Sequence, residues 1–160
     1  MAKINSKNKG NTAERELCKI LEERFIEHKF KRVPNSGAIF GASNRDQAEG
    51  MEDIIVNTFV GDIITPTNFK YSIESKFYKE ISFWDLFNES SSLHQWFKQS
   101  EEDAEFSNRK PMIVAKFNHK KRICFVKEKR KGYVFEHMGW YCYWLEDFLK
   151  LKDNVFFEKE

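Results

Sequence analysis

One stretch of the chain, residues 69–78, alternates strictly between apolar and polar side chains. Phe69, Tyr71, Ile73 and Phe77 fall on one side, and Lys70, Ser72, Glu74 and Lys76 fall on the other. A period of two predicts a β-strand with an apolar back and a charged front. A β-rich segment, residues 58–64, precedes it, and the residues around Pro66 are enough for a turn. We therefore expect a hairpin that brings Asp62 beside Glu74 and Lys76.

A helical pattern comes earlier in the chain. Its apolar stripe consists of Ala13, Leu17, Ile20, Leu21 and Phe25. The helix is expected to begin near Asn11 or Thr12, with Asn11 as the N-cap and Glu14 at the third position of a capping box. Glu14 lies at the margin of the buried face, so its position allows a capping role, a functional role, or both. Residues 1–10 are polar and basic and are expected to form a flexible tail.

The second half of the chain alternates between helical and extended patterns. Residues 82–87 predict a short capped helical turn, and a helix is expected from Leu93 to about Ser107. The apolar run 111–117 is typical of a strand buried on both faces, and residues 122–126 predict its neighbour. Residues 143–151 have the pattern of a short amphipathic C-terminal helix. The predicted fold class is α/β (α+β), one sheet flanked by helices, and residues 1–160 are expected to form a single domain.

Composition adds constraints on location more than on chemistry. Net charge is only +2, but residues 120–131 hold seven basic residues and one acid, whereas Glu101, Glu102, Asp103 and Glu105 form an acidic cluster. Segregated charge suggests one surface for phosphates and another for water. The three cysteines lack the spacing of a disulfide framework or a zinc site. Without an apolar run of membrane-spanning length or a signal peptide, the chain is expected to be cytoplasmic, with no membrane partner.

Two carboxylates and an amine at one sheet edge are the candidate chemistry. Asp62 and Glu74 would repel each other at close range unless a cation lay between them. Mg²⁺ is usually held by one or two carboxylates together with waters and phosphate oxygens, and a nearby Lys76 could orient an attacking water. The alternative is that Glu74 and Lys76 form a solvated pair on an amphipathic strand and that Asp62 is a turn residue.

The spacing of Asp62, Glu74 and Lys76 resembles the signature of the PD-(D/E)xK nuclease superfamily, although Gly61 stands where the motif has Pro. Upstream, Lys9-Gly10-Asn11-Thr12-Ala13-Glu14-Arg15-Glu16-Leu17 is similar to the opening helix of archaeal-type Holliday junction resolvases and their phage relatives. In that family the first Glu of this helix, here Glu14, completes the active site. The resemblance implies a restriction-endonuclease-like mixed sheet flanked by helices and a phage-encoded origin.

The resemblance also implies a Mg²⁺-dependent endonuclease, for which Mn²⁺ should substitute. Asp62, Glu74 and the backbone carbonyl of Ser75 would hold the metal, and Glu14 would bind a second ion or its water shell. Lys76 would orient the nucleophilic water. The preferred substrate is branched DNA, above all a four-way junction, in a role in recombination or repair. A nuclease acting on flaps, single strands or duplexes is the first alternative, and a non-catalytic DNA-binding module is the second.

Candidate DNA contacts are spread along the chain. They comprise Lys9 and Arg15 near the N-terminus, Arg32, Ser36 and Arg45 in the following loops, and the basic cluster Lys127, Lys129, Arg130 and Lys131. Solvated or plain turn positions are the competing interpretation of each. Some relatives place a Gln after the E-x-K strand, which makes Gln95 or Gln99 a weaker candidate for the site.

A homodimer is also expected, because a junction with two-fold symmetry must be cut twice and one chain carries one site. The aromatic residues Trp140, Tyr141, Tyr143 and Trp144 are the candidate contact, since such residues are enriched in interface cores. The alternative is that they complete the core of the monomer.

Overall fold

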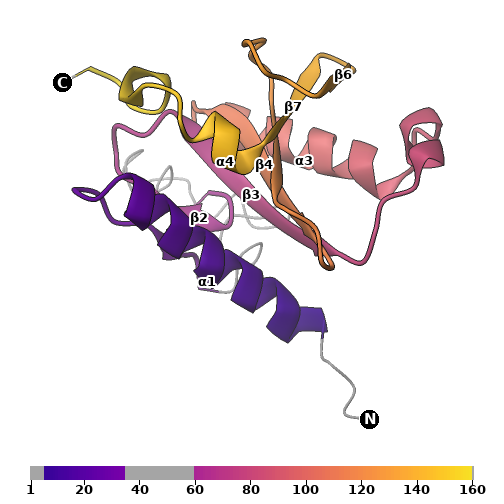
Figure 1. Ribbon diagram of the computed structural model, residues 1–160, viewed down its shortest axis with the longest axis horizontal. Helices are drawn as coiled ribbons and strands as arrows, with labels where there is room; N and C mark the ends of the chain where they lie inside the picture. Colours follow the sequence, from indigo (N-terminus) through magenta and orange to yellow (C-terminus); the bar gives the residue numbers. More distant parts are fainter. Residues whose placement is uncertain (1–5, 35–59, 160) are drawn as a thin grey trace.

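The computed structural model describes residues 6–34 and 60–159, and Figure 1 shows their arrangement. The helices and 3₁₀ turns are α1 (Ser6–Arg24), η2 (Phe83–Phe87), α3 (Ser92–Phe106), α4 (Leu145–Phe148) and η3 (Asp153–Val155). The strands are β1 (Lys31–Arg32), β2 (Ile63–Ile64), β3 (Tyr71–Tyr78), β4 (Lys110–Phe117), β5 (Ile123–Val126), β6 (Phe135–His137) and β7 (Trp140–Trp144). In the described part of the chain, no helix is long and apolar enough to cross a membrane.

Five strands form a mixed sheet in the order β3-β4-β5-β7-β6. The strands β3 and β4 are parallel, with Glu74 opposite Ile113, and the other pairs are antiparallel. On one face α1 and α4 pack against side chains such as Tyr71 and Ile73, while α3 packs on the other face with Phe97 against Phe125. The predicted fold class, a mixed sheet between helices, is confirmed.

The predicted boundaries of α3 and η2 agree with the structure to within one residue. Ser91 is the N-cap of α3 and accepts a hydrogen bond from the backbone of His94, and Ser82 forms a capping box with Asp85 at η2. Both boundaries carry strong local signals, a Ser before an apolar helical pattern. The strand β4 is buried through its middle, as its apolar run predicts.

The predicted start of the first helix is wrong. Helix α1 begins at Ser6, so the stretch from Ser6 to Gly10 of the expected tail is helical. Asn11 lies inside the helix, and its side chain accepts a hydrogen bond from Arg32 at 2.7 Å instead of capping. Thr12 likewise donates to the carbonyl of Asn8, one turn back. Residues 1–5 are outside the described residues.

The expected hairpin between the Asp62 segment and β3 takes a different form. The strand β2 pairs with β1, as Arg32 opposite Ile63, and not with β3. One backbone hydrogen bond, from the Asp62 amide to the Ile73 carbonyl at 2.9 Å, still fastens this segment to the edge of β3. The position beside β3 was therefore predicted, but the pairing partner was not. Residues 58 and 59 lie outside the description.

The C-terminal prediction also needs correction. Tyr143 and Trp144 belong to β7, a strand missing from the prediction, and α4 comprises only Leu145–Phe148. The pairing of β7 with β5 outweighs the helical pattern of the local sequence. Trp140 and Tyr143 are each 2 % exposed, so they belong to the core and are not available as a dimer contact.

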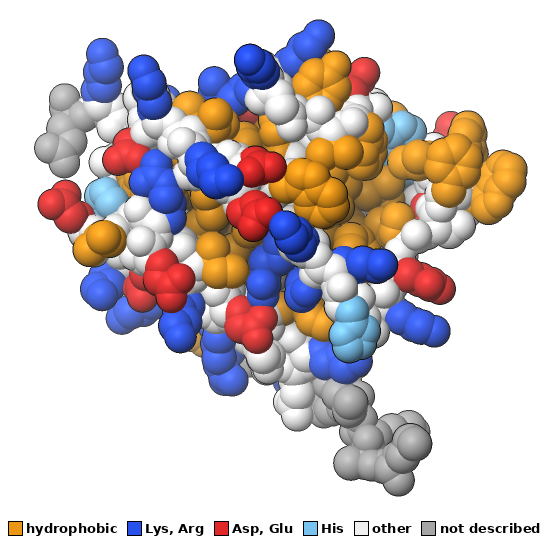
Figure 2. Space-filling view, in the orientation of Figure 1, with side chains coloured by type: hydrophobic (Ala, Val, Ile, Leu, Met, Phe, Trp, Pro, Cys, Tyr) orange, Lys and Arg blue, Asp and Glu red, His pale blue; other side chains and the backbone are white. Residues whose placement is uncertain are grey.

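Exposed aromatic side chains gather elsewhere, on η2. Phe83, Trp84 and Phe87 are 67 %, 73 % and 68 % exposed and contact one another. Figure 2 shows hydrophobic side chains reaching the surface at the right-hand edge, where the chain passes from β3 to α3. Such a patch is unusual on a monomer.

Candidate active site

Asp62 is held against the edge of β3 by two hydrogen bonds. Its carboxylate Oδ2 accepts from the backbone amide of Ser75 at 2.7 Å, and its own amide donates to the Ile73 carbonyl. The turn before it depends on Gly61, whose φ of 85° is in the left-handed region. A Cβ on Gly61 would lie 2.8 Å from the Ile73 carbonyl oxygen, so the chain approaches β3 more closely than another residue would allow.

Glu74 is a buried carboxyl group among other acids. It is 2 % exposed, because α3 covers the polar side of β3 that was predicted to be a charged front. Burial raises the pKa of Glu74 well above its usual range, and the nearby Asp62 raises it further. Lys76 opposes this shift of the pKa, and Asp103 adds to it through its charge and a hydrogen bond between the two carboxyl groups. Three acidic side chains thus lie together where Glu74 is shielded from water.

Lys76 connects the strand to α3. Its Nζ lies 3.8 Å from Glu74 Oε2 and donates to Gln99 Oε1 at 3.0 Å. Gln99 and Asp103 are one turn apart on α3, so both can face β3. The other glutamine candidate, Gln95, donates instead to the Ser90 carbonyl.

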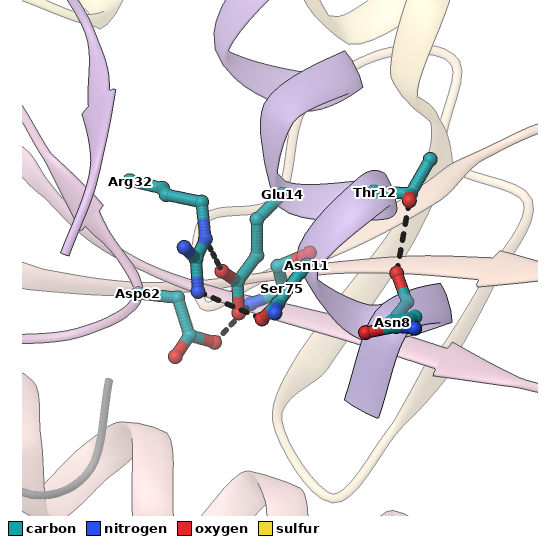
Figure 3. Close-up of polar contacts among 7 residues, drawn as sticks. All are labelled: Asn8, Asn11, Thr12, Glu14, Arg32, Asp62 and Ser75. Carbon is teal, nitrogen blue, oxygen red and sulfur yellow. Dashed lines mark hydrogen bonds and ion pairs between the residues drawn. The ribbon is translucent and has the colours of Figure 1, made fainter. Parts of the chain in front are cut away.

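Glu14 reaches the same region from α1. It is 7 % exposed, and its Oε2 accepts from Arg32 Nε at 2.6 Å. Figure 3 shows this pair beside Asp62 and Ser75, with Asn11 accepting from the second arm of the Arg32 guanidinium. Residues from α1, β1 and β3 therefore meet at one edge of the sheet.

The carboxylates of this site are bonded to protein groups. Over residues 6–34 and 60–159, no group of three or more His, Cys, Asp or Glu side chains has the geometry of a metal site. The Ser75 amide donates a hydrogen bond to one oxygen of Asp62, and the Arg32 guanidinium donates to Glu14. The donors are nevertheless carboxylates, the ligands that a hard divalent cation takes, and Asp62 and Asp103 both act on the buried Glu74.

Sequence reasoning missed two of these neighbours and underrated a third. Asp103 was assigned to an acidic surface cluster, Asn11 to a cap, and Gln99 to a weaker class of candidate. The spacing of Gln99 and Asp103, four residues apart on the helix after the E-x-K strand, was the available signal. Asp103 could not be separated from its exposed neighbours Glu101 and Glu102 without the packing of α3.

The DNA-contact candidates near the N-terminus lie in different settings. Lys9 Nζ lies 5.9 Å from the centre of the Phe77 ring, and Arg15 is exposed on α1. Arg32 is part of the ion pair with Glu14. Ser36 and Arg45 lie outside the described residues.

The basic cluster at residues 127–131 is partly used by the fold. Lys127 donates to Glu101 at 2.7 Å, and the backbone of Arg130 exchanges hydrogen bonds with the Tyr143 hydroxyl. Lys129 lies 5.8 Å from the Tyr133 ring centre, and Lys131 is exposed. The cluster follows the end of β5, which pairs with β7 and with the first half of β4. The strand β3, which carries Glu74, lies beyond β4 at the edge of the sheet.

A mixed sheet whose edge strand carries Glu74 and Lys76, with Asp62 fastened beside it, is the arrangement expected of PD-(D/E)xK nucleases. The chain belongs to the family described as "Phage putative PDDEXK endonuclease", whose model matches residues 5–138. The suspected relationship to the PD-(D/E)xK superfamily is thus confirmed.

Two individual proteins are similar to this chain. Protein D14 of Escherichia phage T5 is 34 % identical over 119 residues, which cover 71 % of this chain and 65 % of that protein's length. The 1.6 Å structure of Hjc, a Holliday junction resolvase from the archaeal hyperthermophile Archaeoglobus fulgidus, matches with a TM-score of 0.43 and 16 % identity. That match covers 91 % of this chain and 90 % of the archaeal chain.

Proposed function

We propose that the chain hydrolyses phosphodiester bonds of branched DNA in a Mg²⁺-dependent reaction, with a four-way junction as the preferred substrate. One observation carries the metal dependence. Glu74 is almost fully buried beside Asp62 and Asp103, and burial and these neighbours raise its pKa. The shift favours the neutral carboxyl group, and a bound cation would offset it by stabilising the ionised form as a ligand.

The residues that would hold the metal are Asp62, Glu74 and the backbone carbonyl of Ser75, with Glu14 toward a second ion or its water shell. A bound Mg²⁺ would supply Lewis-acid polarisation of the phosphate and would lower the pKa of the attacking water. Asp62 and Glu14 would exchange the Ser75 amide and Arg32 for this cation. Mn²⁺, which also accepts oxygen ligands, should substitute.

Lys76 would orient the attacking water and offset charge that develops on the phosphate. Its bond to Gln99 holds the amine beside Glu74, which limits the positions that Nζ can take. Arg32, once released from Glu14, would be a cation within reach of the substrate phosphate. These roles rest on the positions of the side chains along one edge of β3.

The junction preference and the homodimer belong together. Two cuts across a two-fold symmetric junction require two sites, and each chain has one. The contact between chains would have to use a surface other than the buried Trp140 and Tyr143. Light scattering with and without a junction tests this part. The mass of one chain under both conditions would remove the dimer and weaken the junction preference, while leaving the nuclease unaffected.

Cleavage assays on a four-way junction, a flap, a single strand and a duplex of equal length test the whole proposal. We expect cleavage with Mg²⁺ or Mn²⁺, none with EDTA, and the highest rate on the junction. Glu74→Gln should abolish cleavage yet bind DNA as tightly or more tightly, because it removes a metal ligand and a negative charge near phosphate. Glu102→Gln, an exposed acid on α3, is the matched control.

Near-normal cleavage by Glu74→Gln would refute the assignment of the site. Equal rates on all four substrates would leave a nuclease without junction preference. DNA binding with no cleavage in either metal would favour the non-catalytic module.

A further inference from the structure

A cavity of about 540 Å³ opens where the segment before β3 meets the segment between α3 and β4. Its lining includes Lys70, Arg109 and Lys110, the polar Ser107 and Asn108, and one acid, Glu158. We call it the Arg109 pocket. Three cations against one carboxylate make it a positively charged hollow.

Among residues 6–34 and 60–159, two of its cations have no acidic partner. Arg109 donates to neutral acceptors, the Thr65 hydroxyl and the Pro66 carbonyl. Lys70 Nζ donates to the Asn154 carbonyl at 2.7 Å. Within the described ranges, neither side chain has a carboxylate at ion-pair distance, whereas Lys110 pairs with Glu128 at 2.9 Å.

Arg109 is the more informative of the two. It is half-buried, and this burial lowers its pKa because no nearby carboxylate compensates the lost hydration. A guanidinium has five N–H donors in a planar fork, and its two bonds to Thr65 and Pro66 leave several of them unused. A half-buried cation with spare donors at the wall of a cavity is suited to an anion, and phosphate matches the fork.

The pocket adjoins the candidate active site along two elements. Lys70 precedes Glu74 by four residues in extended chain, a span of about 13 Å. Ser107 follows Asp103 by four residues at the end of α3, where one helical turn rises about 6 Å. About four nucleotide steps of duplex cover 13 Å at about 3.4 Å each.

We propose that the Arg109 pocket binds a backbone phosphate of the DNA strand a few nucleotides from the bond that is cut. This inference rests on the proposed nuclease function and adds a positioning contact to it. Lys70 and Arg109 supply the charge, and Glu158 moderates it. The contact would fix the register of the strand at Glu74 without reading its sequence.

Binding in EDTA tests the pocket without requiring cleavage. The probe is a fluorescein-labelled four-way junction of defined sequence, titrated by anisotropy at several salt concentrations. We expect Lys70→Gln/Arg109→Gln to bind about tenfold more weakly or worse, and its log–log salt slope to be smaller by about 0.9. Lys121→Gln, an exposed cation paired with Glu146, is the matched control and should bind like the wild type.

Because Arg109 also donates hydrogen bonds to Thr65 and Pro66, replacing it removes contacts within the fold. Two further measurements therefore leave Arg109 unchanged. Glu158→Gln should bind the junction more tightly, because it removes the acid that the described residues contribute to the pocket lining. Methylphosphonate substitution at each of the five phosphates on either side of the strand crossover should weaken wild-type binding at one position, and Lys70→Gln should be insensitive there.

The outcomes separate cleanly. If no position shows this dependence on Lys70, or if Lys121→Gln has the same effect, the pocket proposal is wrong even when cleavage is observed. Inorganic phosphate is the second probe. If it raises the melting temperature only when Lys70 is present while DNA binding is unaffected, the pocket takes free phosphate and the DNA assignment is overturned. Absence of cleavage with a positive scan would overturn the nuclease function alone.

Discussion

The ion pair between Arg32 and Glu14 is expected to stabilise the folded protein when no metal is bound. The two groups are 2.6 Å apart, and their side chains are 23 % and 9 % exposed. Removing one partner of a buried pair usually costs about 3–5 kcal/mol, because the remaining charge is buried without compensation. Because Arg32 is only partly buried, the cost should lie at the lower end of this range. Arg32 also donates a hydrogen bond to Asn11. We expect Arg32→Gln to lower the free energy of unfolding by about 3 kcal/mol in EDTA.

A double-mutant cycle isolates the pair. Urea denaturation, followed by circular dichroism in EDTA at neutral pH, is measured for Arg32→Gln, Glu14→Gln and the double variant. The double variant should be more stable than the sum of the single losses predicts, with a coupling of about 2 kcal/mol. Glu16→Gln is the control, since the Arg122–Glu16 pair has a 54 % exposed carboxylate and should contribute at most about 1 kcal/mol.

Metal provides the second half of this test. If Glu14 faces a bound ion, Mg²⁺ should restore part of the stability that Arg32→Gln loses, by about 2.7 kcal/mol at a concentration 100 times its Kd. The variant that also carries Glu14→Gln should gain less. A coupling below about 0.5 kcal/mol would refute the energetic argument, and equal gains with and without Glu14 would refute its role toward the metal.

Three further outcomes are expected. Lys76→Met should keep Mg²⁺ binding in calorimetry but lose cleavage, and loss of Mg²⁺ binding would contradict its role at the water. His137 donates to or accepts from His94 at 2.8 Å, and burial and His94 lower its pKa. The unfolded chain then binds more protons below about pH 6.5, so stability should fall as pH drops through this value. His137→Gln should flatten that dependence in urea titrations, and an unchanged slope would contradict the assignment. Gly61→Ala should cost at least about 2 kcal/mol in urea denaturation, because alanine at this positive φ would also meet a backbone carbonyl. A loss below 0.5 kcal/mol would show that the turn relaxes freely.

The strength of local signals explains which parts of the fold were predictable. Ser82 and Ser91 precede helical patterns, and both became caps, so η2 and α3 were placed correctly. The strand β7 was missed because Tyr143 and Trp144 were assigned to the amphipathic helix that follows, whereas they pair with β5. The prediction began helix α1 too late because Asn is a common N-cap residue. The Asn11 side chain instead accepts a hydrogen bond from Arg32, 21 residues away in the sequence.

The site follows the same division. Asp62, Glu74 and Lys76 could be proposed from the sequence because their spacing along the chain is itself a motif. Asp103 was not found, because an acid on a polar helix face looks the same whether that face meets solvent or a neighbouring strand. Its contact with Glu74 depends on how α3 packs against β3, which is a property of the whole sheet.

Gly61 is the clearest departure from the motif, and its conformation explains it. Proline fixes φ near −65°, whereas Gly61 has a φ of 85° and lies too close to the Ile73 carbonyl for any side chain. The chain therefore reaches Asp62 by a turn that proline could not form. In this turn the Asp62 amide is directed to β3 and its carboxylate to the Ser75 amide. The Asp62 carboxylate thus reaches the strand edge by a backbone route that is open to glycine and closed to proline.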